Sequence, residues 1–150
     1  MKKKKVMISG GFDPVHAGHV SLIRYAAKLG KVIVVVNSDA WLRRKKGYRF
    51  MPWSERVEIM EAFKGVTGVC GVDDVDGTVC EAIRRMKPDI FANGGDRTSE
   101  NTPEMILCEE MGIEMAWGIG GGKVQSSSEL VAHAGMHIPL RSNGHRGDTW

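Results

Sequence analysis

The chain has 150 residues, of which 42% are hydrophobic and 26% are charged, as in an ordinary soluble globular protein. This length suits one compact domain, and the net charge of +3 is too small for a dedicated nucleic-acid binder. No apolar run reaches the roughly 20 residues of a membrane span, and the widely spaced cysteines form neither a disulfide framework nor a metal pattern. We therefore expect a cytoplasmic protein that binds a small anion, with no nucleic-acid or membrane partner.

The first part of the chain alternates strand and helix patterns. Residues 5–9 predict a strand that ends at the Gly10-Gly11 turn. An amphipathic helix is expected over about 18–29, because its apolar residues recur at helical spacing. The β-branched run 32–36 predicts a strand that is buried on both faces. Residues 37–39 then offer an N-cap for a short helix that carries a basic run.

The rest of the chain continues this alternation. Helices are expected from residue 52 and over 78–86, 103–111 and 129–134, and strands over 65–72, 89–92 and 113–117. The end of the chain is polar, rich in glycine and without a hydrophobic period. We therefore expect one domain over 1–135 and a partly disordered tail over 136–150.

Strands that alternate with helices predict the fold class. The sequence indicates a single-domain α/β protein with a Rossmann-like, doubly wound parallel sheet and helices on both of its faces. In such a sheet the ligand lies beyond the carboxyl ends of the strands. The loops that follow the strands are therefore the expected place of the site, at residues 10–19, 37–47, 93–98 and 118–128.

The first of these loops carries an HxGH motif at residues 16–19. The preceding glycines let backbone N–H groups come close to a phosphate, and the following helix presents its positive N-terminal end to the same place. His16 and His19 lie three residues apart, so both imidazoles can donate hydrogen bonds to one ligand. A capping role and a zinc pair are the alternatives, but no third Cys or His lies nearby to complete a zinc site.

Residues 12–19 resemble the signature of the cytidylyltransferase-like nucleotidyltransferases. The likeness continues, in the family's order, at residues 27–30, 34–40, 44, 46–47, 55–56, 94–96 and 126–128, and so covers about residues 5–132. Within that superfamily the chain looks most similar to the adenylyltransferase domain of ADP-heptose synthase. Glycerol-3-phosphate and ethanolamine-phosphate cytidylyltransferases are near alternatives. The resemblance implies the HUP-type version of the Rossmann-like fold.

The resemblance also implies roles for the matching residues. The catalytic residues, which would stabilise charge on the nucleotide phosphates, are His16, His19 and Lys46. The substrate-binding residues would be Asn37, Asp39 and Arg97. The nucleotide-binding residues would be Gly10, Gly11, Phe12, Asp13, Gly18, Arg56, Gly94, Gly95, Asp96, Ser126, Ser127 and Ser128.

The implied reaction transfers a nucleoside monophosphate from ATP or CTP to a phosphorylated small molecule and releases pyrophosphate. The acceptor would be a sugar phosphate such as heptose 1-phosphate, or an alcohol phosphate such as glycerol 3-phosphate. The attacking phosphate is already an anion, so the enzyme needs in-line positioning and positive charge instead of a strong base. We expect Mg²⁺ to enter with the nucleoside triphosphate, without a metal site of the protein's own. The resemblance also implies a homodimer.

Two positions depart from the family's pattern. Gly11 stands where the family usually has Thr or Ser, and Asn93 stands where the heptose enzymes have Lys before Gly-Gly-Asp. These departures support one alternative, a nucleotide-binding regulatory module without catalysis. A relative of the tRNA synthetases would share the HxGH motif, but the chain is short and has no Lys-Met-Ser-Lys-Ser stretch. The glycine-rich run 118–123 is one residue short of a P-loop.

Overall fold

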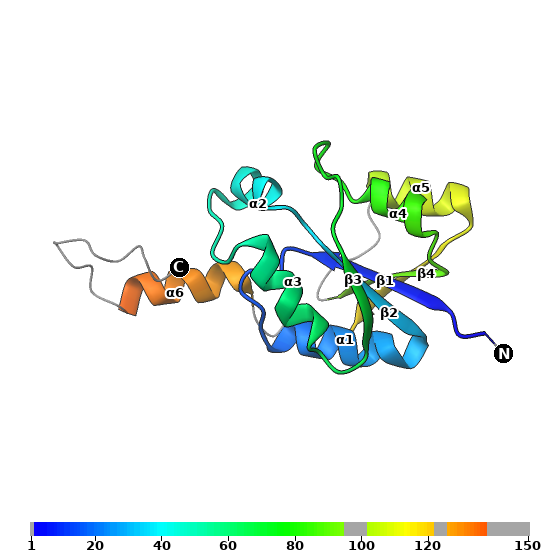
Figure 1. Ribbon diagram of the computed structural model, residues 1–150, viewed down its shortest axis with the longest axis horizontal. Helices are drawn as coiled ribbons and strands as arrows, with labels where there is room; N and C mark the ends of the chain where they lie inside the picture. Colours follow the sequence, from blue (N-terminus) through cyan, green and yellow to red (C-terminus); the bar gives the residue numbers. More distant parts are fainter. Residues whose placement is uncertain (1, 95–101, 122–125, 138–150) are drawn as a thin grey trace.

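The computed structural model describes residues 2–94, 102–121 and 126–137. Within them, five parallel strands form one sheet in the order β3-β2-β1-β4-β5 (Figure 1). The strands are β1 (Lys5–Gly10), β2 (Lys31–Val36), β3 (Val66–Cys70), β4 (Ile90–Gly94) and β5 (Glu114–Ile119). Every connection between consecutive strands contains a helix. The structure thus confirms the doubly wound α/β fold that the sequence predicts.

Helices cover both faces of the sheet, as Figure 1 shows. The helices are α1 (Ala17–Leu29), α2 (Asp39–Lys46), α3 (Trp53–Glu61), α4 (Cys80–Met86), α5 (Pro103–Met111) and α6 (Ser127–His137). Buried side chains of α1 and α3 pack on one face of the sheet, against Val6 and Ile8 of β1. Buried side chains of α4 and α5 pack on the other face, against Met7 of β1. The core therefore has two layers, and β1 contributes alternate residues to each.

The elements differ from the expected ones mainly at their ends. Helix α6 begins before residue 129 and runs past residue 135, the expected end of the domain. Strand β5 ends at Ile119, beyond the expected 117. The expected tail beyond 137 lies outside the described residues. In the part of the chain that the structure describes, no helix has the length and apolar character that crossing a bilayer requires.

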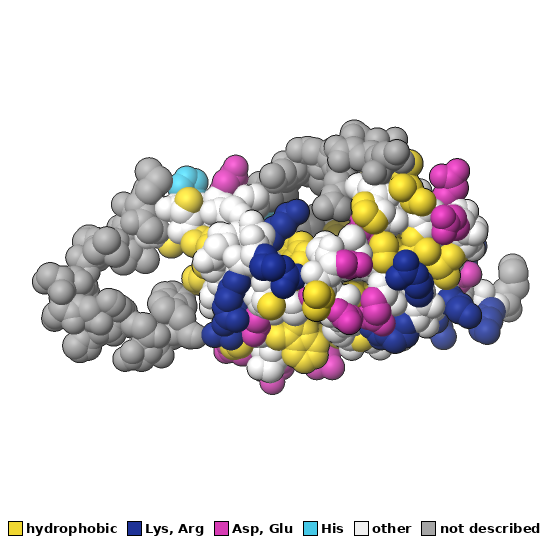
Figure 2. All heavy atoms as spheres, turned by 90° about the horizontal axis from the view of Figure 1, so that it is seen from above, with side chains coloured by type: hydrophobic (Ala, Val, Ile, Leu, Met, Phe, Trp, Pro, Cys, Tyr) yellow, Lys and Arg dark blue, Asp and Glu magenta, His cyan; other side chains and the backbone are white. Residues whose placement is uncertain are grey.

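The carboxyl ends of β1, β2 and β4 lie at one edge of the sheet, because these strands run in the same direction. From β1 the chain passes to β2 and β3 on one side, and later to β4 and β5 on the other. The boundary between β1 and β4 is therefore the switch point at which open α/β sheets bind ligands. Figure 2 shows Lys and Arg side chains gathered over α2, whose last turn holds Arg43, Arg44, Lys45 and Lys46.

Candidate active site

The two histidines of the HxGH motif cap α1. His16 is the N-cap, and its Nδ1 accepts a hydrogen bond from the Gly18 backbone N–H at 3.0 Å. His19 Nδ1 accepts from the His16 backbone N–H at 3.1 Å, which completes a capping box. Because Nδ1 is the acceptor in each ring, a neutral imidazole carries its proton on Nε2. Capping therefore uses Nδ1 in each ring, and a role of Nε2 in phosphate binding is compatible with it.

The imidazole rings form a half-buried aromatic cluster with Phe12. The rings of His16 and His19 are stacked with 3.9 Å between their centroids, and Phe12 meets His19 edge-on at 4.9 Å. Burial lowers the pKa of His19 to about 3, and the charges of His16 and Lys46 add to this shift. His19 is therefore neutral in the ligand-free protein near pH 7. Phe12 is buried and has a φ of 52°, which is a costly backbone conformation for a bulky residue. Such conformations are found repeatedly at functional sites.

Lys46 is the last residue of α2 and lies close enough to His19 for its charge to lower the pKa of that ring. Burial also lowers the pKa of Lys46 itself, and the nearby charge of Asp13 opposes this shift. The three residues predicted to be catalytic, His16, His19 and Lys46, are thus brought together from the start of α1 and the end of α2.

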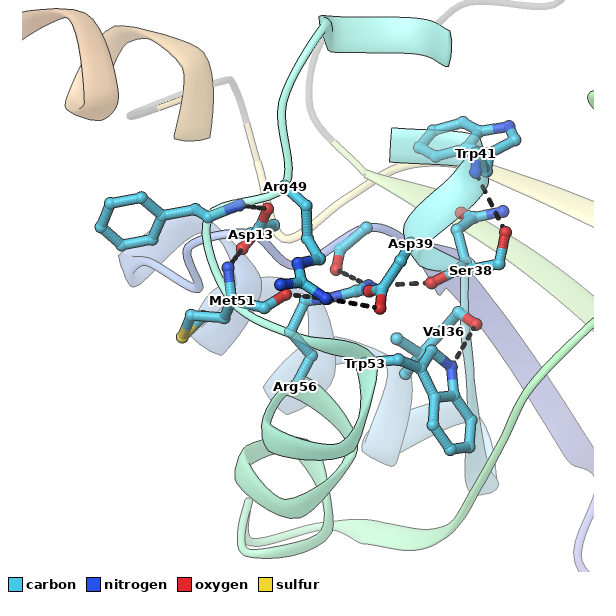
Figure 3. A network of polar contacts seen from close by, with 12 residues as sticks. Asp13, Val36, Ser38, Asp39, Trp41, Arg49, Met51, Trp53 and Arg56 are labelled. Atoms are coloured by element: carbon cyan, nitrogen blue, oxygen red, sulfur yellow. Dashed lines mark hydrogen bonds and ion pairs between the residues drawn. The ribbon is translucent and has the colours of Figure 1, made fainter. Parts of the chain in front are cut away.

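Asp13 ties the first loop to the segment between α2 and α3. Its side chain is fully buried, and its two oxygens accept from the backbone N–H groups of Phe50 and Met51 at 2.6 and 2.7 Å (Figure 3). Asp13 therefore binds protein groups, where the resemblance implies a contact with the nucleotide. The two bonds fix the chain just after Lys46, and so help to set where that ammonium group lies.

Arg56 of α3 is fully buried and holds three loops together (Figure 3). Its guanidinium donates to the backbone carbonyls of Gly11 and Asn37, each at 2.8 Å, and to that of Met51 at 2.9 Å. A fourth bond, at 2.6 Å, reaches a carboxylate oxygen of Asp39. The resemblance implies a contact between Arg56 and the nucleotide, but in the structure this side chain binds the loops after β1 and β2. We name this set of bonds the Arg56 clamp.

Asp39, in the first turn of α2, lies between two arginines. Besides Arg56 it accepts a bond from Arg49 at 3.1 Å. Partial burial alone would raise the pKa of Asp39, but hydrogen bonds and charges from Arg56 and Arg49 hold it below its usual value. The Asp39 side chain is 25% exposed, whereas that of Arg56 is 0% exposed. Asp39 is therefore an anion that still faces solvent, as a substrate contact requires.

Asp74, in the loop after β3, is a buried residue that several hydrogen bonds connect to the loop after β2 and to α2. It was not predicted from the sequence as part of the site. Its carboxylate accepts from Asn37 Nδ2 at 3.0 Å, and from the backbone N–H and hydroxyl of Ser38 at 2.9 and 2.6 Å. Arg44 donates to its backbone carbonyl at 2.8 Å. Asn37, predicted to bind the substrate, is thus buried and bonded to Asp74. Aspartates are common in loops, so no periodic signal in the sequence distinguishes Asp74 from its neighbours.

The serines at the start of α6 lie against the HxGH loop. The hydroxyl of Ser127, which is buried, donates to the Pro14 carbonyl at 2.6 Å across a separation of 113 positions. Ser126 accepts from the Glu129 backbone N–H at 3.0 Å and so caps the helix. Ser128 is exposed. The structure therefore brings the start of α6 to the loop that carries the HxGH motif.

The glycines of the predicted site border the same edge of the sheet. Gly10 ends β1, Gly18 lies in the first turn of α1, and Gly94 ends β4. A Cβ atom on Gly11 would lie 2.7 Å from Leu42 Cδ2, so the buried Leu42 fills the space in which the family's Thr or Ser would stand. Gly95, Asp96 and Arg97 lie outside the described residues.

The arrangement can hold a phosphate but offers little to a bare metal ion. His16, His19 and the N-terminus of α1 lie in or directly after the loop that follows β1, and the charge of Lys46 reaches His19. Among the described residues, no group of three His, Cys, Asp or Glu side chains could hold a metal ion. The nearest acids, Asp13 and Asp39, already accept from backbone N–H groups and from arginines.

The model of the family described as cytidylyltransferase-like matches residues 7–116. The chain belongs to the cytidylyltransferase-like family. The bifunctional protein HldE of Streptomyces coelicolor is 39% identical over 111 residues, which are 71% of this chain and 24% of that protein. HldE of Trichlorobacter lovleyi is 35% identical over 134 residues, 86% of this chain and 27% of that protein. The chain thus spans about a quarter of the length of these relatives.

Solved structures show the same fold. The lipopolysaccharide core biosynthesis protein of Thermoplasma volcanium has a TM-score of 0.65 at 24% identity, with 77% of this chain and 93% of that chain covered. A protein of unknown function from Archaeoglobus fulgidus has a TM-score of 0.57 at 22% identity, with 81% and 99% covered. At these identities the likeness supports the architecture alone.

Proposed function

We propose that this chain transfers a nucleoside monophosphate from ATP or CTP to a sugar phosphate, with release of pyrophosphate. The observation that carries the proposal is the capped pair His16 and His19 beside Lys46, which offers two imidazole rings and a cation at the start of α1. The HldE relatives and the resemblance to ADP-heptose synthase support a sugar 1-phosphate, such as heptose 1-phosphate, as the acceptor. An alcohol phosphate such as glycerol 3-phosphate is the second acceptor to test.

In the proposed reaction an oxygen of the acceptor phosphate forms a bond to the α-phosphorus of the nucleotide. The bond from that phosphorus to the bridging oxygen breaks, and pyrophosphate leaves with the electron pair. His16 and His19 donate from Nε2 to the phosphate oxygens on which negative charge grows, and Lys46 balances part of that charge. The low pKa of His19, about 3, makes it a hydrogen-bond donor and not a proton source.

Mg²⁺ is the divalent ion that we propose enters with the triphosphate. Asp13 and Asp39 are already bonded to backbone N–H groups and to arginines, so phosphate oxygens and water would supply most of its ligands. When bound, the ion would neutralise part of the charge of the triphosphate. The implied homodimer stays a prediction.

Pyrophosphate release tests this function. ATP or CTP is paired with heptose 1-phosphate or glycerol 3-phosphate in the presence of Mg²⁺, and we expect one pair to turn over. His16→Ala should lower kcat by about 100-fold or more, because a donor to the developing charge is lost. A rise in Tm with only one of ATP, CTP, GTP and UTP would identify the nucleotide. Nucleotide binding without turnover of any pair would instead favour the regulatory module.

Two neighbouring lysines provide a matched control. Lys46→Ala should lower kcat/KM by about 10- to 100-fold, since it removes the half-buried cation beside His19. Lys45→Ala, an exposed position in the same turn of α2, should stay within about twofold of the wild type. Equal losses in the two variants would show that Lys46 contributes only to the general positive charge of α2.

A further inference from the structure

Asn93 is a buried amide that lacks a partner for its donor. Asn93 is the second-last residue of β4, at the carboxyl end of the strand, and it is 7% exposed. Within the described part of the chain its Nδ2 has no hydrogen-bond partner. Asn37, the other buried asparagine at this edge, gives its Nδ2 to Asp74. Leaving a buried donor unpaired is costly, so such a group beside a candidate site is suited to bind a ligand that completes it.

The sheet is irregular at Asn93. On one side, β4 pairs with β1 in a register that, continued from Met7 and Phe91, places Asn93 level with Ser9. On the other side, the pairing with β5 shifts between Ala92 and Gly94, so that β5 has one more residue than β4 there. Such bulges occur beside active sites, where they redirect a side chain or end the pairing. Asn93 therefore lies beside the switch point, where the ladder of backbone bonds is broken.

Asn93 faces away from the histidines. Side chains alternate along a strand, and Ala92 packs in the layer that contains α1, whereas Phe91 packs in the layer that contains α4 and α5. Asn93 shares the face of Phe91. His16 and His19 belong to the loop that turns onto α1, on the opposite face. The edge of the sheet thus has phosphate-binding groups on one side and an unpaired amide donor on the other.

The geometry of the reaction places the acceptor on the side of the sheet that α4 and α5 cover. In phosphoryl transfer the attacking and leaving oxygens lie roughly in line on opposite sides of the phosphorus. If the histidines and Lys46 hold the departing phosphates on the α1 side, the acceptor approaches from the α4 and α5 side, where Asn93 lies. We propose that Asn93 Nδ2 donates a hydrogen bond to an oxygen of the acceptor, and so forms a neutral subsite where the heptose enzymes have Lys. This inference rests on the proposed function.

Steady-state kinetics of Asn93→Ala test the subsite, with heptose 1-phosphate as the probe and pyrophosphate release as the signal. We expect KM for the acceptor to rise about tenfold while KM for the nucleotide stays within about twofold. The Tm of the ligand-free variant should be unchanged or higher, since the substitution removes an unpaired donor. A fall in Tm, an equal rise in the KM of the nucleotide, or an unchanged KM of the acceptor would each overturn the proposal.

Two further variants identify which oxygen of the acceptor binds Asn93, and test whether Nδ2 is the donor. Asn93→Asp keeps the shape but replaces the donor with a negative acceptor, and it should weaken acceptor binding at least as much as Asn93→Ala. Asn93→Lys should lower the KM of heptose 1-phosphate if the oxygen belongs to the phosphate, and raise it if the oxygen belongs to a sugar hydroxyl. Absence of turnover in the wild type with every pair would overturn the proposed function and this inference together. Turnover in the wild type with an indifferent Asn93→Ala would overturn only the inference.

Discussion

The HxGH pair and the Arg56 clamp lie at the same edge of the sheet, but they are built in opposite ways. The histidines are fixed by bonds between residues two and three positions apart, within one turn of helix. The clamp joins positions that are up to 45 residues apart and draws on the loops after β1 and β2. The first region places two imidazole rings at the start of α1, where we propose that a phosphate binds, whereas the second directs its donors inward.

This difference separates residues that we expect to act in the reaction from residues that stabilise the fold. The histidine rings are half-buried and accept their capping bonds through Nδ1, so under the proposed function a change there should alter turnover more than folding. Arg56 is completely buried and fixes the carbonyls of Gly11 and Asn37, so a change there should alter folding first. Residues that match the motifs of one family equally well can therefore have different roles, some in the reaction and others in the stability of the fold.

The largest effect is expected from Arg56→Met, which removes the clamp and keeps most of the side-chain volume. One buried and two part-buried carbonyls lose their donor and Asp39 loses an ionic partner, so the free energy of unfolding should fall by about 3–5 kcal/mol. Arg49→Met is the matched control, because it removes a bond to the same carboxylate from a side chain that is 32% exposed. It should cost under about 1 kcal/mol. Urea denaturation followed by circular dichroism would compare the two, and similar losses would contradict a supporting role for Arg56.

The clamp also marks where sequence reasoning reached its limit. The fold and the HxGH loop could be predicted from local patterns and from the rule that parallel strands end at one edge, whereas the grouping of Lys46 with the histidines came from the family resemblance. The bonds of Arg56, Asp13 and Asp74 could not be predicted, since a buried charged residue leaves no periodic signal and its partners are distant in the sequence. A motif match places such residues near the site, but only the folded chain shows which way each side chain points.

An effect that grows as the pH falls should distinguish the histidine region from the clamp. The pKa of His19 is lowered from 6.5 to about 3 in the folded protein, so the unfolded chain takes up a proton first as the pH falls. The stabilisation by the neutral ring is complete above pH 6.5 and is lost toward pH 3, by about 1.4 kcal/mol for each pH unit. Urea denaturation of the ligand-free protein at several pH values would measure this slope.

His19→Asn gives the reference for that slope. The amide oxygen can still accept from the His16 N–H, but the side chain no longer titrates. Between pH 6.5 and 3, the unfolding free energy of this variant should fall less steeply than that of the wild type. Parallel curves for the two proteins would mean that burial does not keep His19 neutral, and the assignment of a neutral donor would then be wrong.

The smallest expected effect concerns the contact between the two regions, at Gly11. Its carbonyl accepts from Arg56, and a Cβ on it would lie 2.7 Å from Leu42 Cδ2. Gly11→Ser, which restores the hydroxyl usual in the family, should therefore destabilise the protein by about 1–3 kcal/mol through overpacking. Leu42→Ala should cost less in the Gly11→Ser background than in the wild type, with a coupling energy of about 1 kcal/mol in a double-mutant cycle. Additive losses would mean that the space is set by the backbone, and that Gly11 and Leu42 do not form one packing unit.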